Sequence, residues 1–193
     1  MESNIMLGFS RSLFSKVFRR IFRSSFIPPI ETKVELGNNN SFINKNCIDT
    51  SKGGSVKIGS NCEFLNGVLL MPYGGSITVG NSCSINPYTV IYGHDRGVII
   101  GDNVLIAAHC VVIPSNHKFE RIDIPINQQG EQSKGIIIKD DVWIGSGCRI
   151  LDGVTIGRGA IVGAGSVVTA SVPDFAIYAG VPAKLIRMRN KQL

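Results

Sequence analysis

The sequence predicts an all-β protein whose chain winds into a triangular parallel β-helix. Three observations support this: large apolar residues recur every six positions, glycine often follows them directly, and a small residue usually comes four positions later. A period of six fits neither an amphipathic helix nor an alternating strand, but it fits a short strand followed by a tight turn. Three such units close a coil of about 18 residues, and stacked coils pair their strands in parallel about 4.8 Å apart.

The repeated apolar residues are expected to point into the prism, where each coil buries them only against its neighbours. The glycines that follow, such as Gly59, Gly101 and Gly145, are expected to supply the positive φ needed at the corners. The apolar set is Ile58, Phe64, Leu70, Val79, Ile85, Ile91, Ile100, Ile106, Val112, Ile138, Ile144, Ile150, Ile156, Val162 and Val168.

Interruptions of the repeat indicate where loops leave the prism. Successive coils begin at Ile58, Val79, Ile100 and Ile138, so the first three exceed the regular length. Each excess follows the third strand of its coil, near 71–78, 92–99 and 113–137, which predicts that all three loops leave the same edge. Loops on a rigid scaffold often carry binding and catalytic residues.

The chain divides into three parts. Residues 31–173 form the predicted β-helix domain, with an extruded loop at 113–137. Residues 1–30 form a basic tail in which Gly8–Phe26 reads as an amphipathic helix. This helix suits two roles, contact with an anionic membrane surface through residues 1–28 or capping of the open prism end. Residues 174–193 are expected to form turns and then a short basic helix over Ala183–Lys191.

Composition excludes several function classes. Hydrophobic residues make up 44% and charged residues 18% of the chain, which is too apolar for disorder. No apolar run is long enough to span a membrane, and basic residues interrupt any signal-peptide core, so a cytoplasmic location is expected, peripheral at the inner face of the cell membrane if the tail binds there. The net charge of +6 lies largely in the tail, which argues against a nucleic-acid partner.

The five cysteines occupy the small-residue position of the repeat. We therefore expect buried wall residues and neither disulfides nor zinc ligands. They are Cys47, Cys62, Cys83, Cys110 and Cys148.

Two of the three histidines lie where chemistry is expected. His117 begins the longest loop and His94 lies in the loop before it, whereas His109 occupies an ordinary turn and is expected to be exposed there. Because histidine titrates near neutral pH, His117 is the predicted general base. The group that orients it stays open between a loop carbonyl, Glu120 and Asp123.

Six segments resemble the hexapeptide-repeat O-acetyltransferases that act on maltose, galactosides and polysaccharides. The resemblance covers roughly residues 56–187 and implies a left-handed β-helix. The segments are Ser115-Asn116-His117, Pro125–Gly130, Val142–Ser146, Gly153–Gly157, Val162–Ser166 and Ala179–Lys184.

This resemblance also implies roles for individual residues. His117 is the base, and Asn86 with His94 or Asp95 contacts the acceptor. The family packs as a homotrimer, whose neighbouring prism supplies a wall for the cleft. One departure is that Ala170-Ser171 replaces a common Lys-Asp pair, which removes a familiar cationic contact to coenzyme A. The residues matching the acetyl-CoA groove are Trp143, Gly145, Ser146 and Ala164, and Lys184 and Arg187 suit its phosphates.

These inferences predict an acetyl-CoA-dependent O-acetyltransferase that acts on a sugar or glycan in capsule or lipopolysaccharide biosynthesis. The hydroxyl attacks the thioester directly, without a metal, and backbone N–H groups near Gly145-Ser146 or the Ser146 hydroxyl stabilise the oxyanion. The alternatives are an amino-sugar N-acetyltransferase and a non-enzymatic β-helix scaffold. A zinc hydrolyase resembling γ-type carbonic anhydrase is disfavoured, because it needs three converging histidines.

Overall fold

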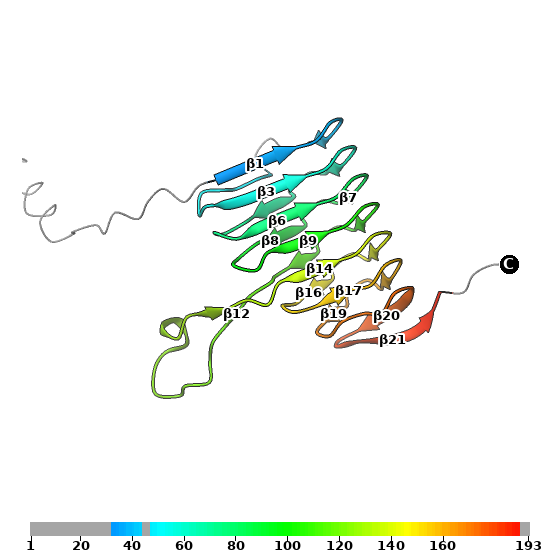
Figure 1. Cartoon of the computed structure of the whole chain (residues 1–193). Helices are drawn as coiled ribbons and strands as arrows, with labels where there is room; N and C mark the ends of the chain where they lie inside the picture. Colours follow the sequence, from blue (N-terminus) through cyan, green and yellow to red (C-terminus); the bar gives the residue numbers. More distant parts are fainter. Residues whose placement is uncertain (1–31, 44–46, 190–193) are drawn as a thin grey trace, which may run out of the picture.

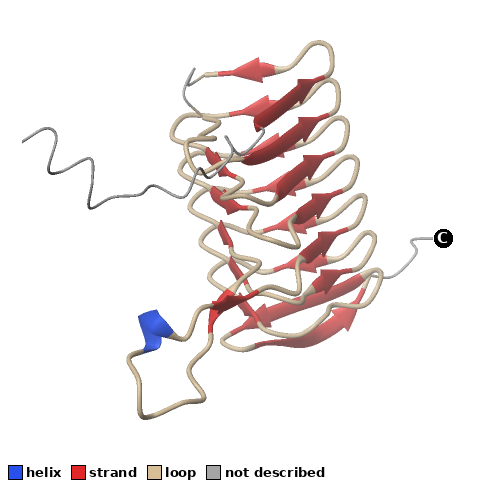
Figure 2. Cartoon of the chain, turned by 60° about the vertical axis from the view of Figure 1, so that its left-hand side comes forward, coloured by secondary structure: helices blue, strands red, loops and turns tan. Residues whose placement is uncertain are grey.

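The computed structural model describes residues 32–43 and 47–189, so the predicted N-terminal helix lies outside the described residues. The chain winds into a prism with three parallel sheets, to which each coil adds strands (Figures 1 and 2). This confirms the predicted parallel β-helix. No helix in the described ranges is long and apolar enough to cross a membrane.

The three sheets are called A, B and C in the order in which the chain enters them. Sheet A contains β1 (Thr32–Leu36), β3 (Gly54–Ile58), β6 (Ser76–Val79), β9 (Val98–Ile100), β14 (Ile136–Ile138) and β17 (Thr155–Ile156). Sheet B contains β2 (Ser41–Phe42), β4 (Glu63–Phe64), β7 (Ser84–Ile85), β10 (Leu105–Ile106), β15 (Trp143–Ile144), β18 (Ile161–Val162), β20 (Ala176–Gly180) and β21 (Ala183–Met188). Sheet C contains β5 (Leu69–Met71), β8 (Val90–Tyr92), β11 (Val111–Val112), β16 (Arg149–Ile150) and β19 (Val167–Val168).

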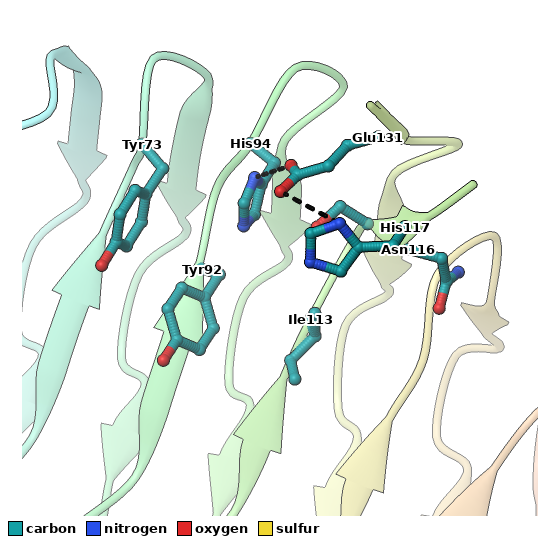
Figure 3. Close-up of a pocket in the computed structure, with 8 residues that line it drawn as sticks. Tyr73, Tyr92, His94, Ile113, Asn116, His117 and Glu131 are labelled. Atoms are coloured by element: carbon teal, nitrogen blue, oxygen red, sulfur yellow. Dashed lines mark ion pairs between the residues drawn. The ribbon is translucent and has the colours of Figure 1, made fainter. Parts of the chain in front are cut away.

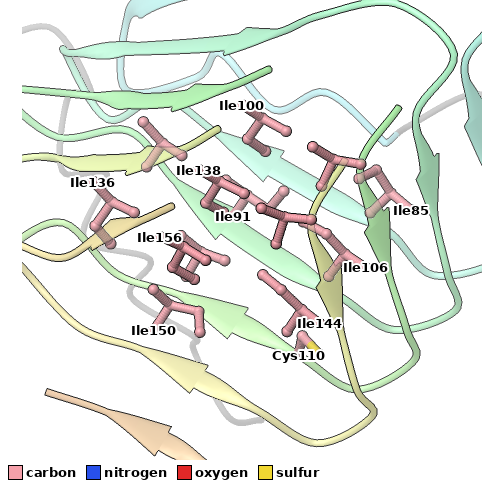
Figure 4. Packing of buried hydrophobic residues seen from close by; sticks show 14 of the residues in the cluster. Ile85, Ile91, Ile100, Ile106, Cys110, Ile136, Ile138, Ile144, Ile150 and Ile156 are labelled. Atoms are coloured by element: carbon pink, nitrogen blue, oxygen red, sulfur yellow. The ribbon is translucent and has the colours of Figure 1, made fainter. Parts of the chain in front are cut away.

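The repeated apolar residues form the core, as predicted. All fifteen positions from Ile58 to Val168 are at most 2% exposed, and isoleucines from all three sheets meet around the axis (Figure 4). All five cysteines are free and buried in the same core. Burial raises the pKa of Cys83 to about 12, so its thiol stays protonated and unreactive. The cysteines are therefore wall residues, as expected.

The role predicted for the glycines that follow the apolar residues is wrong. Gly59, Gly101 and Gly145 are not among the residues with positive φ; in the first two of these turns that conformation falls on Asn61 and Asn103. These glycines are needed for a close approach instead: a Cβ on Gly101 would lie 2.8 Å from the backbone nitrogen of Asp140 in the next coil. Stacking of the coils, and not the corner conformation, excludes a side chain there.

The prism has three edges, named here by the sheets they join. The interrupting loops leave sheet C after β5, β8 and β11 and return to sheet A, so all three lie at the C–A edge, as predicted. The longest carries β12 (Asn116–His117), the short 3-10 helix η1 (Ile126–Gln128) and β13 (Glu131–Gln132), and it extends away from the prism (Figures 1 and 2).

The predicted C-terminal helix is wrong, because residues Ala183–Met188 form β21. This strand pairs antiparallel with β20, which itself continues sheet B in parallel with β18. Without β21, β20 would expose a row of unpaired backbone groups; β21 pairs with them and becomes the last strand of the sheet. Tertiary pairing here overrides the local helical preference.

The opposite end of the prism is open in the described residues. Val34 and Leu36 of β1 pair with Val56 and Ile58, which are 1% and 2% exposed, yet they are themselves 46% and 51% exposed. Their side chains occupy core positions with no coil above them. In the predicted capping role, residues 1–28 would bury these two side chains.

Deleting residues 1–28 should therefore lower the Tm by roughly 4–8 °C, for a loss of about 2 kcal/mol of apolar burial. Thermal unfolding of the two proteins measures the difference. An unchanged Tm, together with loss of cosedimentation with anionic vesicles, would support the membrane role instead.

Candidate active site

Three ionisable side chains meet at the C–A edge. His94 lies in the loop after β8, whereas His117 and Glu131 lie opposite one another on β12 and β13, an antiparallel pair formed within the long loop. Because directly opposed residues bring their side chains together, this small hairpin sets Glu131 beside His117.

Glu131 faces both histidines with its two carboxylate oxygens (Figure 3). Its Oε2 lies 3.5 Å from His94 Nδ1, and its Oε1 lies 3.8 Å from His117 Nδ1. The His117 side chain is 60% exposed, which leaves it open to an incoming substrate, whereas His94 is 21% exposed. The carboxylate lies on the Nδ1 side of the His117 ring, so Nε2 is the nitrogen left to face an acceptor, as a general base requires.

The two carboxylates proposed to orient His117 from the sequence are engaged elsewhere. Glu120 accepts a hydrogen bond from the backbone nitrogen of Phe119, and Asp123 pairs with Arg121. The carboxylate beside His117 is that of Glu131, which is not among the residues predicted from the sequence. Its only signal in the sequence is its place in the same extruded loop, and the loop's internal pairing cannot be derived from the repeat.

An aromatic wall stands beside these groups. Tyr73 and Tyr92, with His94, line a cavity of about 310 Å³ together with His117 and Glu131 (Figure 3). The rings of Tyr73 and His94 are stacked with centroids 5.4 Å apart, and Tyr92 is tilted against both. Neither tyrosine is among the site residues predicted from the sequence, although Tyr73 and Tyr92 fall in two of the segments that interrupt the repeat.

Asp95 lines an adjoining cavity of about 320 Å³ that shares Tyr73, His94 and Glu131 with the first. The predicted acceptor residues His94 and Asp95 are therefore next to the predicted base. Asn86 is not: it lies in the turn between sheets B and C, where its Nδ2 donates to the carbonyl of Ile106 over 3.1 Å.

The residues predicted to hold acetyl-CoA also lie away from His117 in the single chain. Trp143 projects from sheet B and is 51% exposed, and the exposed Ser146 and Ala164 occupy the turns at the B–C edge. The expected backbone donor at Gly145 is wrong, because its N–H already donates to the carbonyl of Val162 at 2.8 Å. Ser146 remains as the residue that can face a developing oxyanion.

Lys184 and Arg187 lie on β21 and not on a helix, and both are exposed. They pair with Ala179 and Ile177 on β20, with a register shift between Ile177 and Tyr178. Ile177 and Ala179 point to the same side of β20, because alternate residues of a strand share a face. The register shift therefore places their partners Arg187 and Lys184 on that face of sheet B, which also carries Trp143. No group of three or more His, Cys, Asp or Glu side chains in the described part of the chain is placed to hold a metal ion.

Sequence and structure comparisons find related proteins of one kind. The family model described as bacterial transferase hexapeptide (six repeats) matches residues 135–170. The chain is 42% identical over 97 residues to a galactoside O-acetyltransferase of Escherichia coli K12, and 36% identical over 104 residues to a putative lipopolysaccharide biosynthesis O-acetyl transferase of the same organism. The chain is therefore similar to hexapeptide-repeat acetyltransferases.

The alignments to these two relatives are partial. They cover 50% of this chain in both cases and 46% and 53% of the two relatives. Another relative, a probable acetyltransferase of Mycobacterium tuberculosis, is 37% identical over 110 residues, which is 54% of this chain and 36% of the relative. The chain thus spans between about a third and about half of the curated relatives' length.

Solved structures of similar proteins match over a longer range. A mutant of AntD, an N-acyltransferase from Bacillus cereus in complex with dTDP and coenzyme A, gives a TM-score of 0.68 at 26% identity and covers 95% of this chain and 91% of AntD. The hexapeptide-repeat acetyltransferase VCA0836 from Vibrio cholerae, complexed with acetyl-CoA, gives 0.60 at 28% identity, with 70% of each chain covered.

Replacing Glu131 by glutamine should lower kcat by about 10- to 100-fold, which is less than the loss expected for removing a general base outright. The amide keeps the size of the side chain but removes the charge beside Nδ1, so the KM for acetyl-CoA should stay within about twofold of wild type, because the change acts on proton transfer only. Steady-state kinetics separate the two constants. Glu120→Gln, on the same loop, is the matched control and should leave kcat unchanged; an equal loss in both variants would refute the positioning role.

Proposed function

We propose that the protein is an acetyl-CoA-dependent O-acetyltransferase that acetylates a sugar hydroxyl, with His117 as the general base. The observation that carries the proposal is the His117–Glu131 pair beside an aromatic-walled cavity at the C–A edge. The relatives named as O-acetyltransferases and the AntD and VCA0836 structures with coenzyme A or acetyl-CoA support the cosubstrate and the reaction.

In the proposed mechanism, Nε2 of His117 takes the proton of the acceptor hydroxyl as its oxygen attacks the thioester carbonyl. The new C–O bond forms, the tetrahedral intermediate collapses with loss of the C–S bond, and the imidazolium returns its proton to the departing thiolate. Glu131 stabilises the imidazolium, and the Ser146 hydroxyl stabilises the oxyanion. The transfer is direct, so the chain needs no acylated nucleophile.

The arrangement of the residues supports a homotrimer. His94, Asp95 and His117 lie at the C–A edge, whereas Asn86, Ser146 and Ala164 lie at the B–C edge, so one chain carries two half-sites. A neighbouring copy can supply the missing half to each cleft. The outward column of sheet B is also apolar, in register at Leu105, Trp143, Ile161 and Ile177, and Leu105 is 48% exposed. Such a stripe is typical of an interface.

The proposed acceptor is a sugar or glycan of cell-surface polysaccharide biosynthesis, in line with the putative lipopolysaccharide O-acetyl transferase among the relatives. The similarity to AntD, an N-acyltransferase with bound dTDP, favours an amino sugar as the second candidate. Acetyl transfer to free sugars, nucleotide sugars, amino sugars and lipid-linked glycans, followed by identification of the O-acetyl or N-acetyl bond, decides between them.

His117→Ala should lower kcat by about 10²–10⁴-fold, because the acceptor loses its base, while acetyl-CoA affinity and assembly stay nearly intact. Transfer assays with isothermal titration of coenzyme A test both parts. Lys118→Ala, at the exposed neighbouring position, is the control. A variant that keeps more than about a tenth of wild-type kcat would mean that His117 is not the base and that His94 is the next candidate.

A mixing experiment tests the shared site. His117→Ala removes the base, and Ala164→Trp blocks the coenzyme groove, so each homotrimer should be inactive. In mixed trimers, one cleft combines the intact base of an Ala164→Trp chain with the intact coenzyme groove of a His117→Ala chain. On random assembly, such clefts should restore about a quarter of wild-type activity. No recovery in mixed trimers, or light scattering that shows an active monomer, would contradict the shared site.

A further inference from the structure

Another stacked pair of aromatic rings lies at the B–C edge, away from the His117 cavity. The rings of Tyr88 and His109 in consecutive coils are 5.2 Å apart and inclined by 14°. Both residues have a left-handed backbone, with φ of 60° and 61°. The same conformation recurs at Gly67, Gly147 and Gly165 in the equivalent turns, so the repeat of the prism imposes it on these two bulky residues.

The stack is closed at one end and open at the other. Gly67 lies at the equivalent turn of the preceding coil. A side chain there would collide with the Tyr88 ring, because its Cβ would lie 2.5 Å from Tyr88 Cδ1. At the following turns the residues are Gly147 and Gly165. A Cβ on Gly147 would meet only the backbone of Gly165 at 3.9 Å, and a Cβ on Gly165 would meet nothing within 4 Å. A side chain at either turn would therefore begin in open space, in contrast to the one at Gly67.

A fixed guanidinium borders this space. Arg149 Nη1 donates to the carbonyls of His109 and Gly147, both at 2.9 Å, and to that of Cys148 at 3.2 Å. No carboxylate in the described ranges forms an ion pair with Arg149, and among these residues only Nη1 donates. Its Nε and Nη2 donors thus remain for a ligand, and a planar guanidinium suits a phosphate group.

We propose that the open face of His109, the step at Gly147 and Gly165, and Arg149 form a nucleotide subsite. A base continues the Tyr88–His109 stack, and Arg149 binds a phosphate. Stacking on an aromatic side chain tolerates any base, so the geometry specifies a nucleotide and not its identity. This inference rests on the proposed function, in which the nucleotide belongs either to coenzyme A or to a nucleotide-linked sugar acceptor.

Direct binding to the full-length protein tests the subsite without any transfer activity. Isothermal titration would use adenosine 3′,5′-bisphosphate for the coenzyme and UDP and dTDP for the acceptor. His109→Ala should weaken at least one of them by about 5- to 100-fold, whereas His109→Phe, which keeps a ring, should stay within about threefold. Asn103→Ala is the matched control, because Asn103 has the same left-handed φ of 57° in a turn at another edge.

Arg149→Ala separates the two parts of the ligand. It should weaken binding of the phosphate-bearing probes, whereas the weak binding of the parent nucleosides, adenosine, uridine and thymidine, should change by less than about twofold, because they carry no phosphate for the guanidinium. Kinetics then identify the source: His109→Ala should raise the KM for acetyl-CoA but not for acetyl-pantetheine, or the KM for a nucleotide sugar but not for the free sugar.

Two results overturn the subsite: no nucleotide binds the wild-type protein, or binding in a folded His109→Ala protein equals that in wild type. Nucleotide binding that depends on His109, in a protein that transfers acetyl to no acceptor, leaves the subsite in place and refutes the proposed function. Acetyl transfer with wild-type kinetics in the His109→Ala protein would refute the subsite and leave the proposed function in place. Circular dichroism and the Tm confirm that each variant is folded.

Discussion

In-register stacking of the coils is the constraint on which the rest of the molecule depends. Each inward residue packs against the same position in the coils above and below, as in the column Ile85, Ile106, Ile144 and Val162, and against inward residues of the other two sheets. A coil can therefore not shorten or slip without exposing its apolar residues. It can lengthen only where the chain turns between sheets, and the three coils that begin at Ile58, Val79 and Ile100 all do so at the C–A edge.

This constraint also places the polar groups. A turn position recurs at the same edge one coil later, so residues far apart in the sequence become neighbours along the prism. Tyr73 and His94 stack at the C–A edge, and Tyr88 and His109 stack at the B–C edge, each pair in consecutive coils and each with positive φ. The prism thus aligns side chains of consecutive coils along its edges, while the extruded loop supplies Glu131 from outside the repeat.

The same geometry separates the two halves of the proposed reaction. The base and its carboxylate belong to one edge, and the predicted coenzyme residues belong to another edge and to the outer face of sheet B. In the proposed mechanism these two edges meet across a neighbouring chain, which makes assembly part of the proposed chemistry.

The sequence alone determined the six-residue period, the buried core from Ile58 to Val168, the cysteines as wall residues and the loops at one edge, because each is a local pattern repeated along the chain. It also placed His117 and His94 on neighbouring loops. Only the tertiary structure decided the rest. The pairing of β12 with β13 brings Glu131 to His117, the free edge of β20 draws the C-terminal residues into a strand, and the close approach of stacked coils, not corner conformation, requires glycine at Gly101 and Gly145. These features depend on which segments meet in space, and a period along the sequence does not encode the path of a loop that leaves it.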